Sequence, residues 1–174
     1  KLKGVSYGDF PTYLSALKTH LMSFSSFSAI NRIRKRSDCG TNESVSLSPN
    51  LITVDYVSGA DMLFEKERFL ELDGFDEEFF LYFEETDLQL RAVYAGYSNA
   101  LLLSSEVIHI GNGSELKKIR TQINFLISEI KFLRNHHRIN GFKIFFLQLI
   151  AGAAFLKTNL KEYRITELLY FLKN

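Results

Sequence analysis

Apolar residues recur with a helical period near the N-terminus of the chain. Over residues 9–36 they fall three or four positions apart, which predicts a helix with Asp9 or Thr12 as its N-cap and Pro11 near its first turn. The expected apolar stripe of this helix is Tyr13, Leu14, Leu17, Leu21 and Phe24. Residues 37–50 are polar, contain Gly and Pro, and predict a loop.

A helical period returns in the last third of the chain. Residues 116–134 repeat apolar positions at intervals of three and four, which is typical of an amphipathic helix. Residues 144–156 are apolar apart from Gln148 and are short for a membrane span. They predict a core helix, with binding at a membrane interface as the alternative. Residues 163–172 predict a last short helix.

Between these helical regions the pattern changes to short apolar runs separated by turn residues. The runs 51–57, 62–64, 97–103 and 107–110 predict strands. Two stretches, 65–72 and 86–95, predict helices, with Gly74 as the C′ residue of the first and Gly96 ending the second. Strands interleaved with helices predict the α/β fold class.

Composition suits one soluble globular domain, with 174 residues of which 46% are hydrophobic. The net charge of +1 hides an uneven distribution. The N-terminal part is basic around residues 32–36, which suits phosphate or an anionic membrane surface, or is only a solvated helix end. Residues 55–87 are strongly acidic, which suits a divalent cation or a polyhydroxylated substrate.

Two further features concern the cell compartment and the ends of the chain. The single cysteine, Cys39, cannot form an internal disulfide and fits a reducing compartment. The first residues, Lys-Leu-Lys-Gly, show neither a signal-peptide pattern nor an initial methionine. We therefore expect that the chain begins inside a longer one.

Candidate chemistry gathers in residues 74–91, where five aromatic residues alternate with six carboxylates. Aromatic neighbours remove water from a carboxylate and raise its pKa, which makes it a better general base near neutral pH. The alternative is that these acids stabilise helix ends: Asp76 would cap a turn over residues 77–79, and Glu84 and Glu85 would favour the helix that follows them.

Six motifs follow one another in a fixed order across the middle of the chain. They are Val54-Asp-Tyr-Val-Ser-Gly-Ala60, Phe69-Leu-Glu-Leu-Asp-Gly-Phe-Asp-Glu77, Phe80-Leu-Tyr-Phe-Glu-Glu-Thr-Asp-Leu88, Arg91, Ala95-Gly-Tyr97 and Val107-Ile-His109. This succession resembles the C-terminal half of the family 2 glycosyltransferases, above all the rhamnosyltransferase-like branch that builds bacterial surface polysaccharides. The resemblance covers about a third of the chain.

The resemblance implies a catalytic role for the carboxylates of the third motif. Glu85 would be the general base that deprotonates the acceptor hydroxyl, with Glu84 beside it to position a substrate. Asp87 would face the acceptor or cap the helix. The family nearly always has Asp where this chain has Glu85, and the extra methylene moves the carboxylate by roughly 1.5 Å. Either the site has adjusted to a longer base or the chain is a poor catalyst.

Substrate and metal contacts are also implied. The segment Ser58, Gly59 and Ala60 would lie under the sugar and acceptor, and Asp61 stands where a small or apolar residue is more usual. Asp76 is a further candidate substrate contact. His109 would complete the coordination of a divalent metal, manganese or magnesium, that bridges the diphosphate; a lone histidine at a strand end is otherwise more often structural. Ser114 would contact phosphate.

The resemblance implies a partial GT-A fold, a mixed sheet with flanking helices and a C-terminal helical extension. Residues 1–50 would form a helical and loop lead-in, residues 51–114 the acceptor and catalytic half, and residues 115–174 the C-terminal helices. The family's nucleotide-holding half, with its Asp-x-Asp-like motif, does not precede Val54. An exposed sheet edge would then invite dimer formation.

The expected activity is that of an inverting, nucleotide-sugar-dependent glycosyltransferase. Its expected partners are a nucleotide-diphosphate sugar donor and a glycan or lipid-linked acceptor, with no nucleic acid, in the cytoplasm or at the inner face of the membrane. Two alternatives stay open. One is a non-catalytic fragment or degenerate transferase that acts as an interaction module, and the other is a membrane-surface adaptor.

Overall fold

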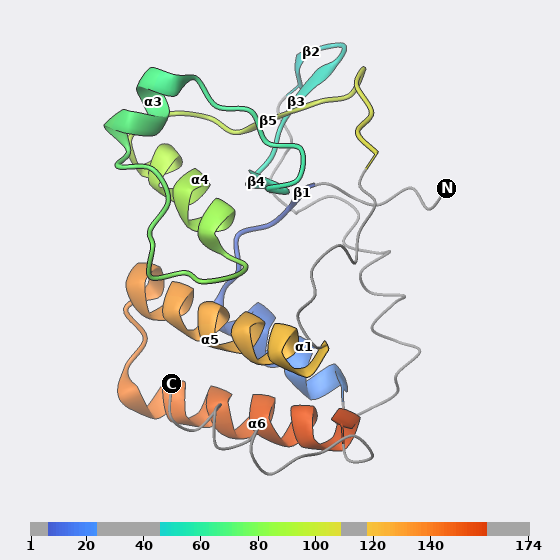
Figure 1. Cartoon of the computed structure of the whole chain (residues 1–174), viewed down its shortest axis with the longest axis vertical. Coiled ribbons are helices and arrows are strands. Elements are labelled where there is room, and N and C mark those ends of the chain that lie inside the picture. The colour runs from blue at the N-terminus through green and yellow to red at the C-terminus, as the bar shows by residue number, and fades with distance from the viewer. Residues whose placement is uncertain (1–6, 24–45, 109–117, 160–174) are drawn as a thin grey trace. The chain divides into compact units, whose positions relative to one another are not determined.

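The computed structural model describes residues 7–23, 46–108 and 118–159 (Figure 1). These residues belong to two compact units, each made from two separate stretches of chain. We call residues 7–10 with 46–108 the sheet unit, and residues 11–23 with 118–159 the helical unit. Helices and short strands are mixed in the described parts, which agrees with the predicted α/β class.

Two small antiparallel sheets lie in the sheet unit. Strand β1 (Tyr7–Gly8) pairs with β4 (Tyr56–Val57). The other sheet has the order β2-β3-β5, formed by β2 (Ser46–Ser48), β3 (Leu51–Thr53) and β5 (Ala100–Leu102). Its register places Leu51 opposite Leu102 and Thr53 opposite Ala100.

Among the described residues, the strands predicted at 51–57 and 97–103 are found in place, and both are shorter than predicted. The predicted strand 51–57 is divided between the two sheets. Val54 donates its N–H to the carbonyl of Asn99 at 3.0 Å, and the carboxylate of Asp55 accepts the N–H of Phe10 at 2.8 Å. These contacts turn the chain between β3 and β4. No strand forms at residues 62–64, and Val107 and Ile108 are also outside strands.

Helix α3 (Lys66–Glu71) confirms the helix predicted for residues 65–72, and it is one residue shorter at each end. Asp73 and Gly74 both have positive φ, 59° and 66°. Asp73 donates its N–H to Leu70 and Gly74 donates to Phe69, the pattern of a Schellman motif with Asp73 at C′. Gly74 is therefore C″ and not C′. A Cβ on Gly74 would meet the Phe69 ring at 3.1 Å.

Helix α4 (Glu84–Tyr94) begins two residues before the predicted start at residue 86. Its C-terminal end is the one expected. Gly96 has φ 90° and donates to the carbonyl of Val93, while Tyr97 donates to that of Ala92. The buried face of the helix includes Leu88, Leu90 and Ala92. This face fixes α4 in the sheet unit.

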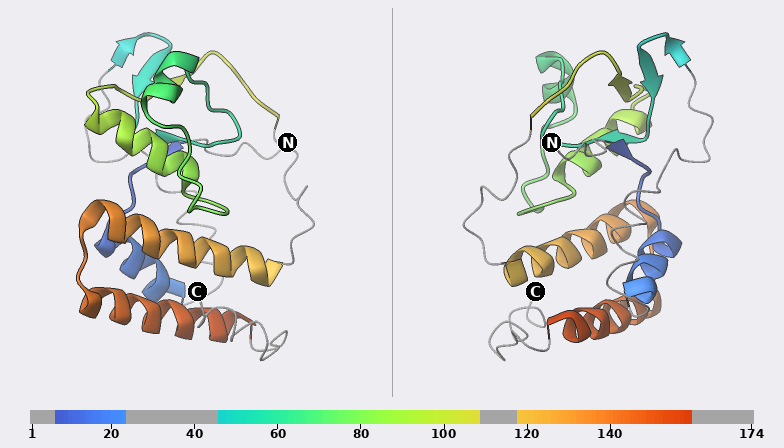
Figure 2. Two further views of the ribbon diagram at one scale, coloured as in Figure 1. Left: turned by 60° about the vertical axis from the view of Figure 1, so that its left-hand side comes forward. Right: turned by 90° about the vertical axis from the view of Figure 1, so that its right-hand side faces the viewer.

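The helical unit contains α1 (Tyr13–Ser23), α5 (Lys118–His137) and α6 (Gly141–Asn159), which pack against one another (Figure 2). Thr12 caps α1, since its hydroxyl accepts the N–H of Ser15 at 3.1 Å and Ser15 Oγ accepts the N–H of Thr12 at 2.8 Å. The predicted apolar stripe of α1 is partly wrong. Ala16 and His20 are its buried residues, whereas Leu14 and Leu21 are exposed.

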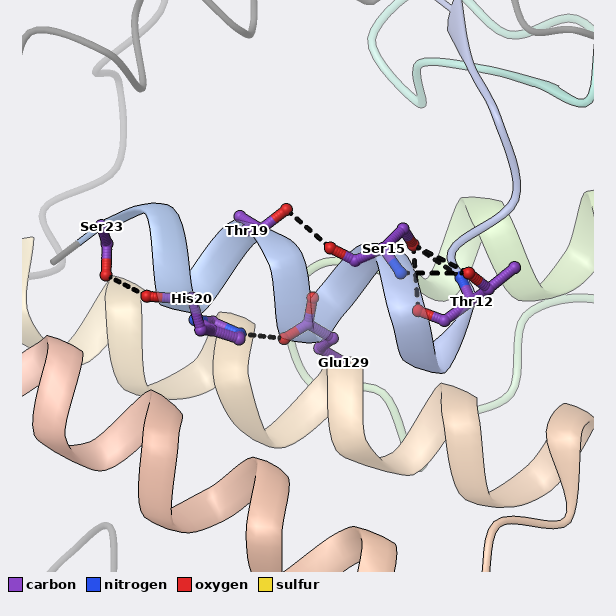
Figure 3. Close-up of polar contacts among 6 residues, drawn as sticks. All are labelled: Thr12, Ser15, Thr19, His20, Ser23 and Glu129. Carbon is purple, nitrogen blue, oxygen red and sulfur yellow. Dashed lines mark hydrogen bonds and ion pairs between the residues drawn. The ribbon is translucent and has the colours of Figure 1, made fainter. Parts of the chain in front are cut away.

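The core of the helical unit joins α5 to α6. It contains Ile123 and Leu126 from α5 and Ala151 and Phe155 from α6, which confirms that α6 packs into a core on one face. A buried polar pair connects α1 to α5: His20 Nε2 lies 2.6 Å from Glu129 Oε2 (Figure 3). Within residues 7–23, 46–108 and 118–159, no helix is both long and apolar enough to cross a membrane.

Several predictions concern residues outside the described ranges. These are the continuation of the first helix over residues 24–36, Cys39, the second half of the predicted strand 107–110, and the last helix over residues 163–172.

Candidate functional site

The N-terminus of α4 is held in place by an unusual backbone turn. Tyr82 and Phe83, directly before the helix, both lie in the left-handed region, with φ 66° and 70°. Such a conformation costs a residue other than glycine about 1–3 kcal/mol and persists only where surrounding contacts impose it. Phe83 is 6% exposed, so its ring supplies such contacts. The turn fixes the direction in which Glu84 and Glu85 leave the backbone.

Glu84 and Glu85 occupy the first turn of α4 and make no side-chain cap there, because the N-cap residue is Phe83. Glu84 Oε2 and Glu85 Oε2 are buried and accept no hydrogen bond from the described residues, and the same is true of Asp61 Oδ1. A buried carboxylate oxygen without a donor costs free energy. Three such atoms in one compact unit are the strongest indication of a ligand site.

Burial raises the pKa of Glu85 above its ordinary value, and the negative charge of Glu84 adds to the rise. The backbone N–H groups of Glu85 and Thr86 act in the opposite direction. The desolvated carboxylate predicted from the aromatic surroundings is therefore present at Glu85. A carboxylate with a raised pKa is a stronger base when ionised.

The loop that follows β4 lies against Glu85. A Cβ on Gly59 would come 3.3 Å from Cβ and 3.4 Å from Cγ of Glu85. Within the loop, Asp61 donates its N–H to the carbonyl of Ser58 at 3.1 Å, and the N–H of Ala60 lies 3.4 Å from Ser58 Oγ. Gly59 and Ala60 are exposed. The structure thus brings Gly59 of this loop and Glu85 together, although they are 26 positions apart in the sequence.

Gln89 holds this arrangement and was missed in the sequence. Its side chain is 1% exposed, accepts the N–H of Val57 at 2.8 Å, and donates to the carbonyls of Val57 at 2.8 Å and Glu85 at 3.0 Å. Asn99 adds donations to the carbonyls of Asp55 and Gln89. The available signal was a lone amide between Leu88 and Leu90 on a helix with an apolar face.

Asp87 is 2% exposed and accepts a hydrogen bond from Arg91 Nε at 2.8 Å. The Arg91 guanidinium also donates to the carbonyl of Gly74 at 2.7 Å and to that of Leu72. Asp87 therefore orients an arginine that secures the C-terminal end of α3 to α4. This arrangement gives Asp87 a structural function.

The remaining candidates are more scattered. Asp76 Oδ1 accepts the N–H of Glu78 at 2.9 Å, and the N–H of Phe79 donates to the Asp76 carbonyl, so Asp76 stabilises a turn as the capping alternative predicted. His109 and Ser114 lie outside the described residues. Among residues 7–23, 46–108 and 118–159, no group of three or more His, Cys, Asp or Glu side chains is placed to hold a metal ion.

Comparison with known proteins gives one limited similarity. The chain is 36% identical over 63 residues to N-acetylglucosaminyl-diphospho-decaprenol L-rhamnosyltransferase from two strains of Mycobacterium tuberculosis. The match covers 36% of this chain and 20% of each relative. No protein-family model matches the chain. No solved structure matches it either. The similarity supports a glycosyltransferase-like relationship over the matched stretch.

Proposed function

We propose that this chain is the acceptor and catalytic half of a glycosyltransferase with a GT-A fold. It would transfer a sugar from a nucleotide-diphosphate sugar to a hydroxyl group of a glycan or lipid-linked glycan, in surface polysaccharide synthesis at the cytoplasmic side of the membrane. The observation that carries the proposal is Glu85, a buried carboxylate at the start of α4 with a raised pKa and an oxygen that lacks a donor. The rhamnosyltransferase activity of the similar mycobacterial proteins supports the same class of reaction.

The proposed reaction is a direct displacement. Glu85 accepts the proton of the acceptor hydroxyl, and the oxygen attacks the anomeric carbon of the donor sugar. The bond from that carbon to the diphosphate oxygen breaks, and the diphosphate leaves with the electron pair. Attack from the side opposite the leaving group inverts the anomeric centre. The raised pKa of Glu85 suits this role because a general base works best when its pKa lies near the working pH.

The loop 58–61 is the proposed floor of the acceptor site. Gly59 lies beside Glu85 and its neighbours Ser58 and Ala60 are small, so a sugar ring can approach the base closely. Glu84 and Asp61 each have an oxygen free to accept a hydrogen bond from an acceptor hydroxyl. Asp76 and Ser114 remain proposed outer contacts. Asp87 contributes through Arg91 and the α3 end.

A divalent cation, manganese or magnesium, remains part of the proposal, with His109 as its suggested ligand. When bound, such an ion would neutralise charge on the diphosphate. No three metal-ligating side chains lie close together among the described residues, and no step of the proposed reaction depends on the ion.

The proposal is tested first by thermal unfolding of the chain with UDP-sugars and dTDP-sugars, followed by a transfer assay with a lipid-linked glycan. A donor present at about a hundredfold its Kd stabilises the folded state by about 2.7 kcal/mol. A Tm rise with one donor would show a donor site within this chain. An acceptor half alone should show no such rise, and transfer is then measured in a longer chain that contains the donor-binding half. In whichever form transfers, Glu85→Gln should abolish transfer.

Matched variants make the result specific. Glu77→Gln, an exposed acid in the preceding turn, should transfer normally. Glu85→Asp distinguishes an adapted site from a decayed one, because loss of rate indicates that the site has adjusted to Glu and gain of rate indicates decay from an active ancestor. Transfer that survives Glu85→Gln would overturn the assignment of the base. A longer chain that binds a donor but transfers nothing would favour the alternative of a degenerate transferase that acts as an interaction module.

A further inference from the structure

Helix α6 presents two apolar faces, and only one of them is packed. Rotation of about 100° per residue places its buried side chains within an arc of about 100°; these are Leu147, Ala151, Ala154 and Phe155. A second set of apolar side chains occupies the opposite arc and is exposed, namely Phe142, Phe145, Phe146, Leu149 and Leu156. We call this second set the outer face of α6.

The outer face is too apolar to be an ordinary solvated helix surface. Phe142 is 77% exposed, Phe145 62% and Leu149 59%. A helix that is apolar all round is normally buried in a core or spans a membrane. Within residues 11–23 and 118–159, α6 packs against α1 and α5 (Figure 2), and it does not meet the requirement for a membrane span. The outer face therefore calls for a partner that covers it.

The charge of the helical unit indicates which kind of partner covers the outer face. The described part of the helical unit contains eight Lys and Arg residues and one acid, Glu129, so its net charge is +7. The Glu129 side chain is buried against His20, so its carboxylate is not on the surface of the unit. Helix α6 itself has Lys143 near its start and Lys157 near its end, and it has no acidic residue. Both lysines are exposed. Lys157 lies at the edge of the outer face, and Lys143 lies further round the same side, with its Nζ 5.6 Å from the centroid of the Tyr13 ring.

We infer that the outer face of α6 docks the helical unit onto an anionic lipid bilayer. An interfacial helix buries Phe and Leu side chains at the boundary between headgroups and acyl chains, with lysines at its edge that meet anionic headgroups. Each lysine near such a surface favours binding by about fivefold at physiological ionic strength. This inference is independent of the proposed transfer reaction.

The sheet unit has the opposite character. Its described residues contain three Lys and Arg residues and fourteen acids, for a net charge of −11. An anionic surface repels such a unit. The two units thus differ sharply in their predicted response to a membrane, which provides an internal control for the experiment.

The test is co-sedimentation of the 174-residue chain with vesicles of phosphatidylcholine alone and with vesicles that also contain phosphatidylglycerol. We expect binding to the anionic vesicles that weakens at high salt. Phe145→Ser with Leu149→Ser should lower the partition coefficient at least tenfold, because each side chain loses its burial in lipid. Lys143→Gln with Lys157→Gln should lower it on anionic vesicles only. Both changes are at exposed positions, and circular dichroism checks that the variants keep their helix content.

The matched control changes equally exposed apolar residues of the sheet unit. Leu63→Ser with Phe80→Ser, at positions that are 95% and 76% exposed, should leave vesicle binding unchanged. Equal binding to neutral and anionic vesicles, or binding that survives Phe145→Ser with Leu149→Ser, would overturn the inference. So would a concentration-dependent dimer that this same double variant dissociates in the absence of any vesicle binding, because the occupant would then be a second copy of the chain.

Discussion

Gly59 and Glu85 are so close that a methyl group on Gly59 would lie 3.3 Å from Cβ of Glu85. This distance is shorter than ordinary van der Waals contact, so the two residues cannot keep their positions if Gly59 gains a side chain. The relationship makes the loop after β4 and the first turn of α4 parts of one site. Substitution of Gly59 therefore tests whether the two segments form one site, because Gly59 does not have a positive φ that would itself make a side chain unfavourable.

Gly59→Ala should therefore displace Glu85 by a few tenths of an ångström and lower any transfer rate, since a displacement of about 1 Å can cost a hundredfold. The cost in unfolding free energy should be about 1 kcal/mol, because Gly59 is exposed and can relax. Urea denaturation and initial rates measure the two effects. Gly141→Ala is the control, since a Cβ there meets nothing within 4 Å. Equal effects of the two variants would show that Gly59 does not constrain Glu85.

The raised pKa of Glu85 predicts a pH-dependent stability. The folded protein binds the Glu85 proton more tightly than the unfolded chain does, so the stability contribution is complete below the ordinary pKa of 4.5 and is lost as pH rises through the folded pKa. Gln cannot ionise. Glu85→Gln should therefore gain stability relative to the parent chain between about pH 4 and about pH 7.

Chemical denaturation at the two pH values checks this prediction. Glu67→Gln, at an exposed position of α3, controls for the change of side chain and should show no such gain. A difference between Glu85→Gln and the parent that stays constant with pH would mean that Glu85 is solvated in the folded chain.

Arg91 should be the most costly arginine to remove from the sheet unit. Arg91→Met removes the ion pair to the buried Asp87 carboxylate and the donations to the carbonyls of Leu72 and Gly74 at the end of α3, for an expected loss of about 3–5 kcal/mol. Arg68→Met removes surface pairs with Glu65 and Glu71 and an exposed cation–π contact with the Tyr97 ring, and should cost about 1 kcal/mol. Comparable denaturation midpoints for the two variants would contradict the structural function of the Asp87–Arg91 pair.

His20 and Glu129 should be energetically coupled. His20→Leu removes the hydrogen-bond partner of the buried Glu129 side chain, and Glu129→Leu removes that of the buried His20 side chain. Each variant should lower the free energy of unfolding by about 2–4 kcal/mol. The double variant replaces both polar groups with apolar ones and should cost less than the sum of the single variants by about 1–3 kcal/mol. A double-mutant cycle measured by urea denaturation gives this coupling, and strict additivity would show that the pair contributes nothing.

Local signals allowed the helices and their ends to be predicted. Gly96 and Thr12 act on neighbours within five residues, so their effects are readable from the sequence. The break between β3 and β4 was not readable, because it depends on contacts of Asp55 with Phe10 and of Val54 with Asn99, more than forty residues away. The buried face of α1 was misassigned for the same reason, since His20 is placed inside by Glu129 from another helix.

The features of the candidate site also fall into those that local sequence predicts and those that depend on tertiary contacts. Aromatic residues among the acids of 74–91 predicted a desolvated carboxylate, and only the family resemblance pointed to Glu85, whose pKa is raised by burial. The contact between Gly59 and Glu85 and the bonds of Gln89 depend on tertiary packing, which no local pattern reveals. Glu85 as catalyst, and the metal at His109, remain predictions.

Gln89 determines how this site can fluctuate. Its side chain makes two hydrogen bonds to the backbone of Val57 in β4 and one to the carbonyl of Glu85 in the first turn of α4. Displacement of Gln89 therefore loosens both segments. In hydrogen-exchange terms, we expect β4 and the first turn of α4 to belong to one cooperative unit, and the Val57 amide to report its opening.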